Sequence, residues 1–179
     1  MIHPLAKFLF CPCCSSAHFE VNDFKSKRCT DCGFTFYHNS AAATVAVILN
    51  SRNELLVTRR AFNPAAGTLD LPGGFVDAGE TAEEGIVREV EEETGGKAVV
   101  EKFLFSLPNE YVYSDFIVHT TDLFFLCRFI DETALIAHDD AAALFWIPLA
   151  DIRPSNFGLA SIAAGVQKLL DSNISYTPT

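Results

Sequence analysis

The sequence lacks any apolar run long enough to cross a membrane, which needs roughly 18 to 20 continuous apolar residues. Its opening residues, MIHPLAKFLFCPCC, contain too short an apolar segment for a secretory signal peptide. It also lacks low-complexity segments and internal repeats. These absences predict a protein of the cytoplasm without a membrane partner.

Basic residues are scarce in most of the chain, whose net charge is -10 over 179 residues. Residues 1–40 carry four Lys or Arg against three Asp or Glu, and the remainder carries nine against twenty. Such an acidic body repels phosphates, which argues against a nucleic-acid partner. Apolar residues are abundant at 49%, with 16 Phe, enough for the core of one ordinary domain.

Cysteine is also rare beyond the first 32 residues, which hold five of the six. Disulfides are disfavoured in the cytoplasm, and free thiols do not explain the paired spacing. Two CxxC pairs, fourteen residues apart, predict a structural Zn²⁺ site. The pairs are Cys11 with Cys14 and Cys29 with Cys32. Cys13 leaves an ambiguity, because it could replace Cys14 as a ligand.

The texture of the chain changes after Tyr37, and we place a domain boundary near residue 40. A segment as small as 1–40 needs the metal for much of its folding free energy, and we predict a zinc ribbon there. In 41–179 we predict strands at 43–49, 54–60, 98–106, 111–118, 121–130 and 142–147. The predicted helices are 81–94 and 158–171. This order predicts an α/β sandwich with a mixed sheet.

The central helix is marked at both ends. Thr81 and Glu84 form a capping box at its start, and Gly95 and Gly96 follow its last turn. Its apolar stripe would face the core, so its acidic residues would lie together on another face.

Three glutamates of this helix, Glu89, Glu92 and Glu93, stand at i, i+3 and i+4 and share that face. Gathered oxygen ligands suit Mg²⁺ or Mn²⁺, although a solvated acidic face is the simpler alternative. The preceding LPGG loop favours the metal site, because its bare backbone lets phosphate and metal approach.

The segment GGFVDAGETAEEGIVREVEEETG resembles the signature of the Nudix family of hydrolases. Only the final aliphatic position differs, where the chain has Gly96. LLVTRR and FWIPLADI also resemble Nudix segments, so the likeness spans most of residues 41–179. The matching positions are Gly74, Glu80, Arg88, Glu89, Val90, Glu92, Glu93 and Gly95. The resemblance implies a Nudix α/β/α sandwich.

The resemblance also implies a metal-dependent pyrophosphohydrolase. The implied ligands of Mg²⁺ or Mn²⁺ are Glu89, Glu92 and Glu93, with the carbonyl of Gly73 as a further ligand. Arg88 would orient Glu89, and Glu80 would pair with Arg88 or reach the metal through water. The catalytic base differs among family members; Asp139 and Asp140 are our candidates in a later loop, with a solvated turn as the alternative.

A four-cysteine ribbon ahead of such a domain resembles the bacterial NADH pyrophosphatases. Their SQPWPFPxS element corresponds here to SLPNEYVYS, which keeps part of it and loses the Trp, the Gln and two prolines. The resemblance implies a substrate like NADH or ADP-ribose, a nucleoside diphosphate linked to another moiety. Phe62, Phe75, Tyr111 and Tyr113 could stack on a base, and one of Arg59 and Arg60 could contact phosphate. The predicted substrate contacts are Gly73, Gly74, Arg59, Phe75 and Tyr111.

A second class of function is a nucleotide-sensing or RNA-binding module without catalysis. Lys25, Lys27 and Arg28 beside Phe24 would give the ribbon a short basic and aromatic face. The complete set of box residues favours the enzyme, because a retired enzyme has no need of them. A third hypothesis is a homodimer formed through the ribbon.

Overall fold

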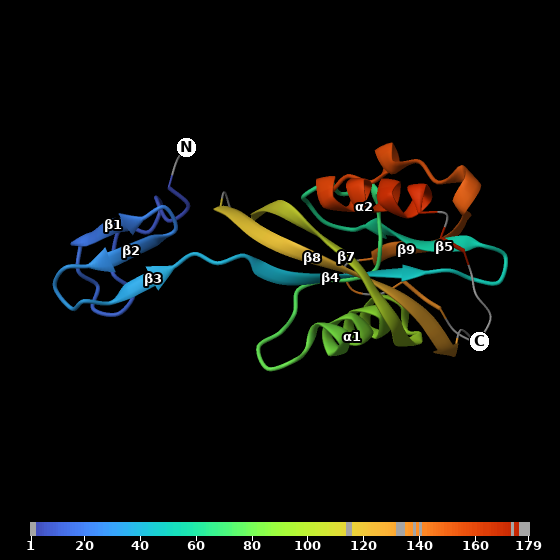
Figure 1. Ribbon diagram of the computed structural model, residues 1–179, viewed down its shortest axis with the longest axis horizontal. Coiled ribbons are helices and arrows are strands. Elements are labelled where there is room, and N and C mark those ends of the chain that lie inside the picture. Colours follow the sequence, from blue (N-terminus) through green and yellow to red (C-terminus); the bar gives the residue numbers. More distant parts are fainter. Residues whose placement is uncertain are drawn as a thin grey trace. The chain divides into compact units, whose positions relative to one another are not determined.

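The computed structural model of the chain forms two compact units, residues 1–40 and 41–179 (Figure 1). It describes residues 3–113, 116–131, 135–137, 139, 141–172 and 174–175. None of the helices in these ranges is long and apolar enough to cross a membrane.

The first unit is a small antiparallel sheet held to two cysteine-bearing turns. Its strands, in the order β1-β2-β3, are β1 (Phe19–Asp23), β2 (Ser26–Cys29) and β3 (Thr35–Tyr37). Cys11, Phe19 and Cys29 form its buried cluster, and Leu5 is fully buried as well. So little apolar burial cannot offset the entropy of ordering forty residues, and the fold depends on its cysteines.

The described residues of the second unit form two three-stranded sheets. The first has the order β4-β8-β7, with β4 parallel and β7 antiparallel to β8, so it is mixed. Its strands are β4 (Ala41–Ile48), β7 (Lys97–Tyr113) and β8 (Phe116–Asp131). The second is antiparallel, in the order β6-β5-β9, with β5 (Glu54–Arg60), β6 (Leu69–Asp70) and β9 (Ala141–Pro148).

Helices α1 (Ala82–Thr94) and α2 (Ala160–Asp171) lie on opposite faces of these strands (Figure 1). Side chains of a strand alternate between faces, and β4 is buried on both. Val45 and Val47 belong to one core cluster with Val166 of α2. Ala46 belongs to the other, with Ile86 of α1. The run VAVIL at 45–49 is therefore continuously apolar, and the predicted α/β/α sandwich with a mixed sheet is confirmed.

The long hairpin of β7 and β8 differs from the prediction. We expected separate strands at 98–106, 111–118 and 121–130, but β7 continues to Tyr113 and β8 begins at Phe116. Pro108 lies within β7 and stays in register opposite Thr121. Proline is tolerated there because β7 is an edge strand. On its outer side no further strand of the described residues pairs with it, so the missing N–H of proline removes no hydrogen bond between strands there.

The ends of α1 follow the prediction. Thr81 accepts a hydrogen bond from the N–H of Glu84, and the Glu84 carboxylate accepts one from the N–H of Thr81. Gly95 closes the helix in the left-handed conformation, with φ of 70°. The last helix, expected at 158–171, begins two residues later, at Ala160. Short 3-10 turns at Leu149–Asp151 and Pro154–Asn156 precede it.

Candidate active site and metal centre

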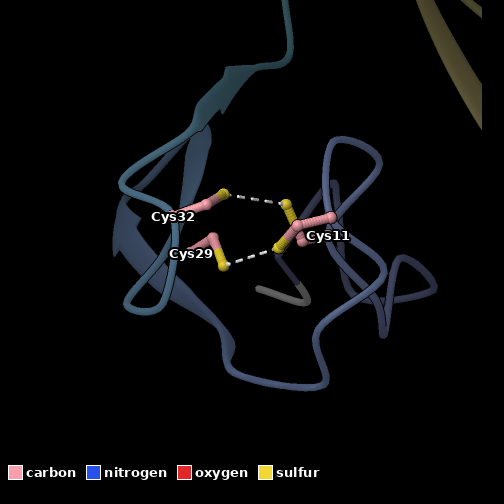
Figure 2. Close-up of side chains that lie close together, drawn as sticks. Cys11, Cys29 and Cys32 are labelled. Atoms are coloured by element: carbon pink, nitrogen blue, oxygen red, sulfur yellow. Dashed lines mark hydrogen bonds between the residues drawn. The ribbon is translucent and has the colours of Figure 1, made fainter.

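Four thiols of the first unit converge on one point (Figure 2). Their sulfurs lie within 4.8 Å of one another, with Cys11 and Cys32 at 3.7 Å and Cys14 and Cys29 at 3.6 Å. Four sulfurs bound tetrahedrally to a zinc ion at about 2.3 Å would stand about 3.8 Å apart. The donor set and its spacing therefore fit a tetrahedral thiolate site.

Cys14, and not Cys13, belongs to this cluster. Cys13 is exposed, and its backbone N–H donates to the sulfur of Cys11 at 3.4 Å. It thus serves the site through its amide, which orients the neighbouring sulfur. The position of the Cys14 sulfur with the other three favours Cys14 over Cys13 as the candidate ligand.

The backbone of the second turn prepares a thiolate. Backbone N–H groups of Cys32 and Asp31 lower the pKa of Cys29 to about 7. The N–H of Phe34 acts in the same direction on Cys32, but its contacts with the other thiols and burial raise its pKa to about 12. Four thiolates repel one another, so full deprotonation of the cluster requires a cation.

The basic and aromatic face expected on this unit is smaller than the sequence suggested. Phe24 is exposed and Lys25 lies over its ring at 5.9 Å. Lys27 is buried instead, donating to the carbonyl of Phe8 at 2.6 Å and lying 5.1 Å from the ring of Phe19. Alternation along β2 turns it inward, so it offers nothing to a ligand at the surface.

In the second unit, Arg88 of α1 organises the acidic segment. Its guanidinium makes a two-pronged contact with Glu80, at 2.7 and 3.2 Å. It also donates to Glu89 and Glu92, both at 2.9 Å, and to the carbonyl of Phe75 at 3.0 Å. A planar guanidinium has five donors in a fixed fork, so one side chain can hold these groups together.

The loop before α1 lies against both β4 and Glu89. The carbonyls of Pro72 and Gly74 accept hydrogen bonds from Ala46 and Thr44, both at 2.7 Å. A Cβ on Gly73 would lie 2.0 Å from the carbonyl oxygen of Thr44. A Cβ on Gly74 would lie 2.4 Å from the carboxylate of Glu89. Gly73 is required because the backbone of β4 leaves no room for a side chain, and Gly74 leaves the space that the Glu89 carboxylate occupies.

Glu89, Glu92 and Glu93, the three glutamates of the Nudix signature proposed as metal ligands, lie in different environments. The side chain of Glu92 is 47% exposed, that of Glu89 is 15% exposed, and Glu93 is buried. Among the described residues, only the four cysteines bring at least three potential ligands together, so the glutamates do not converge here. Arg88 draws the carboxylates of Glu89 and Glu92 to itself, and metal binding there requires them to reorient.

The surroundings of Glu89 raise the pKa of its carboxyl group. Burial raises its pKa, the contacts with Arg88 oppose the rise, and the charges of Glu92 and Asp139 add to it. The effect of Asp139 places that exposed residue within electrostatic reach of Glu89. Asp140, the other candidate for a loop acid, lies outside the described residues.

A cavity of about 130 Å³ opens next to the glycine loop. Its walls come from β4, β5, β6, β7, β8 and the segment leading into α2. Phe75 and Tyr111 meet edge to face at its wall, with ring centroids 6.2 Å apart. The other polar or loop residues that line it are Thr44, Arg60, Asp70, Gly73, Gly74, Asn109, Thr120 and Asp122.

Four of the five predicted substrate contacts line this cavity, and Arg59 does not. Arg59 is exposed, donates to the carbonyl of Gly67 at 2.9 Å and lies over the ring of Phe145. Arg60 lines the cavity instead, because successive side chains of a strand point to opposite faces and Arg59 therefore points outward. Of the other stacking candidates, Phe62 and Tyr113 are 63% and 66% exposed and stand outside the cavity.

Sequence reasoning missed the buried acids of the cavity, Asp70 and Asp122. Each interrupts an otherwise apolar segment, LDLPGG or TTDLFFLC, and a charge within such a run is the signal that could have identified them.

Comparison with known proteins agrees with this fold. A family model of the NUDIX domain matches residues 39–166. The chain is 50% identical over 54 residues to an ADP-ribose pyrophosphatase of Methanocaldococcus jannaschii, covering 30% of this chain and 32% of that protein. It is 32% identical over 94 residues to the NAD-capped RNA hydrolase NudC of Haemophilus influenzae, covering 52% of this chain and 36% of the other.

The fold likeness extends further than these alignments. A NUDIX hydrolase of Nitrosomonas europaea has a TM-score of 0.74 at 17% identity, covering 92% of this chain and 91% of that one. The chain spans about a third of the length of the two curated relatives above. Because the family model covers most of its length, the chain belongs to the NUDIX domain family.

Proposed function

We propose that this protein is a metal-dependent pyrophosphohydrolase that cleaves the diphosphate between a nucleoside and another moiety, as in NADH or ADP-ribose. The observation that carries the proposal is the array centred on Arg88, which fixes Glu80, Glu89 and Glu92 beside the Gly74 backbone. An isolated solvated acidic helix needs no such array. The relatives named ADP-ribose pyrophosphatase and NAD-capped RNA hydrolase support the substrate class.

In this proposal Glu89, Glu92 and Glu93 hold Mg²⁺ or Mn²⁺, with the carbonyl of Gly73 as a further ligand. The cation supplies charge neutralisation of the diphosphate and an activated water for in-line attack on phosphorus. Arg88 sets the rotamer of Glu89, and Glu80 in turn holds the guanidinium. Asp139 is our candidate for the group that accepts the proton of the attacking water.

We further propose that residues 1–40 form a zinc ribbon domain and residues 41–179 the hydrolase domain. Cys11, Cys14, Cys29 and Cys32 would hold a structural Zn²⁺, since their sulfur spacing suits that ion. Zinc there would stabilise the first unit and take no part in hydrolysis.

The test is hydrolysis of a substrate panel with Mg²⁺ or Mn²⁺, with products resolved by ion-exchange chromatography. The panel includes NADH, NAD, ADP-ribose, NAD-capped RNA, nucleotide sugars, diadenosine polyphosphates and nucleoside triphosphates. We expect cleavage of a dinucleotide or ADP-ribose, and its loss in Glu92→Gln/Glu93→Gln. Glu91→Gln is the matched control, because Glu91 is exposed on the same helix and is not among the proposed ligands.

Two outcomes contradict the proposal. Activity retained in the double variant would remove the glutamates from the metal site. Absence of turnover with either metal, in protein shown to contain zinc, would favour the alternative of a binding module without catalysis, which binding of the same ligands would then test.

A further inference from the structure

The buried residue Asp122 is among those that line the cavity beside the glycine loop. Its two oxygens accept hydrogen bonds from the hydroxyls of Thr120, at 2.6 Å, and Ser161, at 2.5 Å. An ionised carboxylate has about four acceptor positions, so these two hydroxyls leave capacity for another donor. Of these three residues, Asp122 and Thr120 line the cavity, whereas Ser161 supports Asp122 from α2.

The charges around the cavity favour a ligand that donates hydrogen bonds. Asp70 is buried and pairs with Arg60, which leaves Asp122 without a cation of its own among the residues lining the cavity. Burial raises the pKa of Asp70, Arg60 opposes the rise, and the charge of Asp122 adds to it, so the two carboxylates sense one another. A phosphate would be repelled from this interior, and an uncharged group with N–H donors would be attracted.

The size of the cavity and its aromatic wall further limit the kind of ligand that it can bind. Its volume of about 130 Å³ is below the roughly 300 Å³ at which pockets for whole drug-sized ligands begin, so it holds one ring-sized moiety. Phe75 and Tyr111 offer ring surface against which a flat heterocycle can pack. Gly73 and Gly74 line the same cavity and Gly74 abuts Glu89, which connects it to the proposed diphosphate site.

We propose that this cavity binds the nucleobase of the substrate and that Asp122 selects bases with an exocyclic amino group, by accepting a hydrogen bond from it. Asp122 is thereby a specificity-determining residue of the site, positioned by Thr120 and Ser161. The inference rests on the proposed function for the location of the diphosphate, but the binding itself needs neither metal nor phosphate.

The test is equilibrium binding of adenosine and inosine to the full chain by calorimetry, without divalent metal. The two nucleosides differ at the 6 position, where adenosine has an amino donor and inosine a carbonyl acceptor, and at N1, which is an acceptor in adenosine and a donor in inosine. We expect the unaltered protein to bind adenosine at least about tenfold more tightly, since a hydrogen bond to a charged acceptor is lost and two acceptors are opposed. Cytidine and uridine repeat the comparison on a smaller ring and should rank the same way.

The variant Asp122→Asn tests whether Asp122 causes the preference for adenosine over inosine. The carboxamide can turn its NH₂ toward the inosine carbonyl, so the ratio of the two dissociation constants should fall at least about tenfold. Asp151→Asn is the matched control, because it makes the same chemical change at an exposed residue that does not line the cavity, and it should keep the preference for adenosine.

Several results overturn the inference: equal affinities for the two nucleosides, no binding of either by the unaltered protein, or an unchanged ratio in Asp122→Asn. The first two need no variant, so they decide even if Asp122→Asn fails to fold. Adenosine binding without hydrolysis of the substrate panel would refute the proposed function and keep this inference. Hydrolysis without discrimination between adenine and hypoxanthine substrates would refute this inference and keep the proposed function.

Discussion

Arg88 makes the largest set of polar contacts around the proposed metal site. It donates hydrogen bonds to three carboxylates and to the carbonyl of Phe75, and its side chain is 28% exposed. A lysine keeps the charge but has one nitrogen, so it cannot hold Glu80 and Glu89 together. The geometry of the site therefore depends on the guanidinium itself.

We expect Arg88→Lys to lower kcat/KM for the best substrate by about 10- to 100-fold, the usual cost of losing a group that orients metal ligands. Steady-state kinetics at saturating Mg²⁺ measure it. Arg128→Lys is the control, since Arg128 makes one contact, with Glu101 at 3.1 Å, away from the box. Equal activity of Arg88→Lys and Arg128→Lys would show that positive charge alone suffices.

Glu80 makes the stability of the folded state depend on pH. Hydrogen bonds from Arg88 and from the N–H of Asp77 lower its pKa below the ordinary value. A lowered folded pKa contributes stability that is complete above the unfolded value, about 4.3, and is lost as pH falls through the folded one.

In Glu80→Gln, measured in chelator, the free energy of unfolding should therefore decline less between about pH 5 and about pH 3 than in the unaltered protein. Urea unfolding at several pH values gives this slope. Identical slopes for the two proteins would mean that the Glu80–Arg88 contact is not linked to folding.

At the scale of elements, Gly96 explains why the chain departs from the Nudix signature at its last position. A Cβ on Gly96 would lie 2.5 Å from the ring of Phe129 and 2.6 Å from Leu135. These side chains from β8 and the segment after it occupy the space that an aliphatic residue would fill. The missing side chain at the end of α1 is thus compensated by larger side chains from β8 and the segment after it.

Gly96→Val should lower the free energy of unfolding by about 1–3 kcal/mol through overpacking. Chemical denaturation measures the loss. Phe129→Leu in the same chain should recover part of it by vacating volume, so the two changes should be non-additive. Purely additive effects would locate the strain elsewhere.

At the scale of the whole molecule, the two units have separate cores. The first contains Cys11, Phe19 and Cys29, whereas both larger clusters lie entirely within residues 41–179. Loss of the proposed zinc should therefore unfold the first unit and leave the second folded.

Cys14→Ser should abolish bound zinc and make residues 1–40 sensitive to protease, while Cys13→Ser should retain one zinc per chain. Elemental analysis and limited proteolysis measure the two effects. The matched pair isolates ligand identity, because the substituted residues are adjacent and both exposed. Zinc loss in Cys13→Ser with retention in Cys14→Ser would reverse the assignment.

Much of the proposed site was predictable because it is local. The spacing of Glu80, Arg88 and Glu89 places them on one helix and the loop before it, and Thr81 with Glu84 fixes where that helix begins. The choice between Arg59 and Arg60 was not predictable, since it depends on which face of β5 meets the cavity. A shift of β5 by one residue in its pairing would place Arg59, rather than Arg60, on the face toward the cavity.

The sequence by itself determined the family, the spacing of the four cysteines, the extent of α1 and the glycines before it, because contacts over a few residues decide these features. Only the tertiary structure decided that Cys14 joins the cluster, that β7 continues through Pro108, and that Asp70 and Asp122 share a cavity. Those features depend on pairing between distant segments, such as β4 with β8. Such pairing is set by how two buried faces pack, which no local pattern specifies.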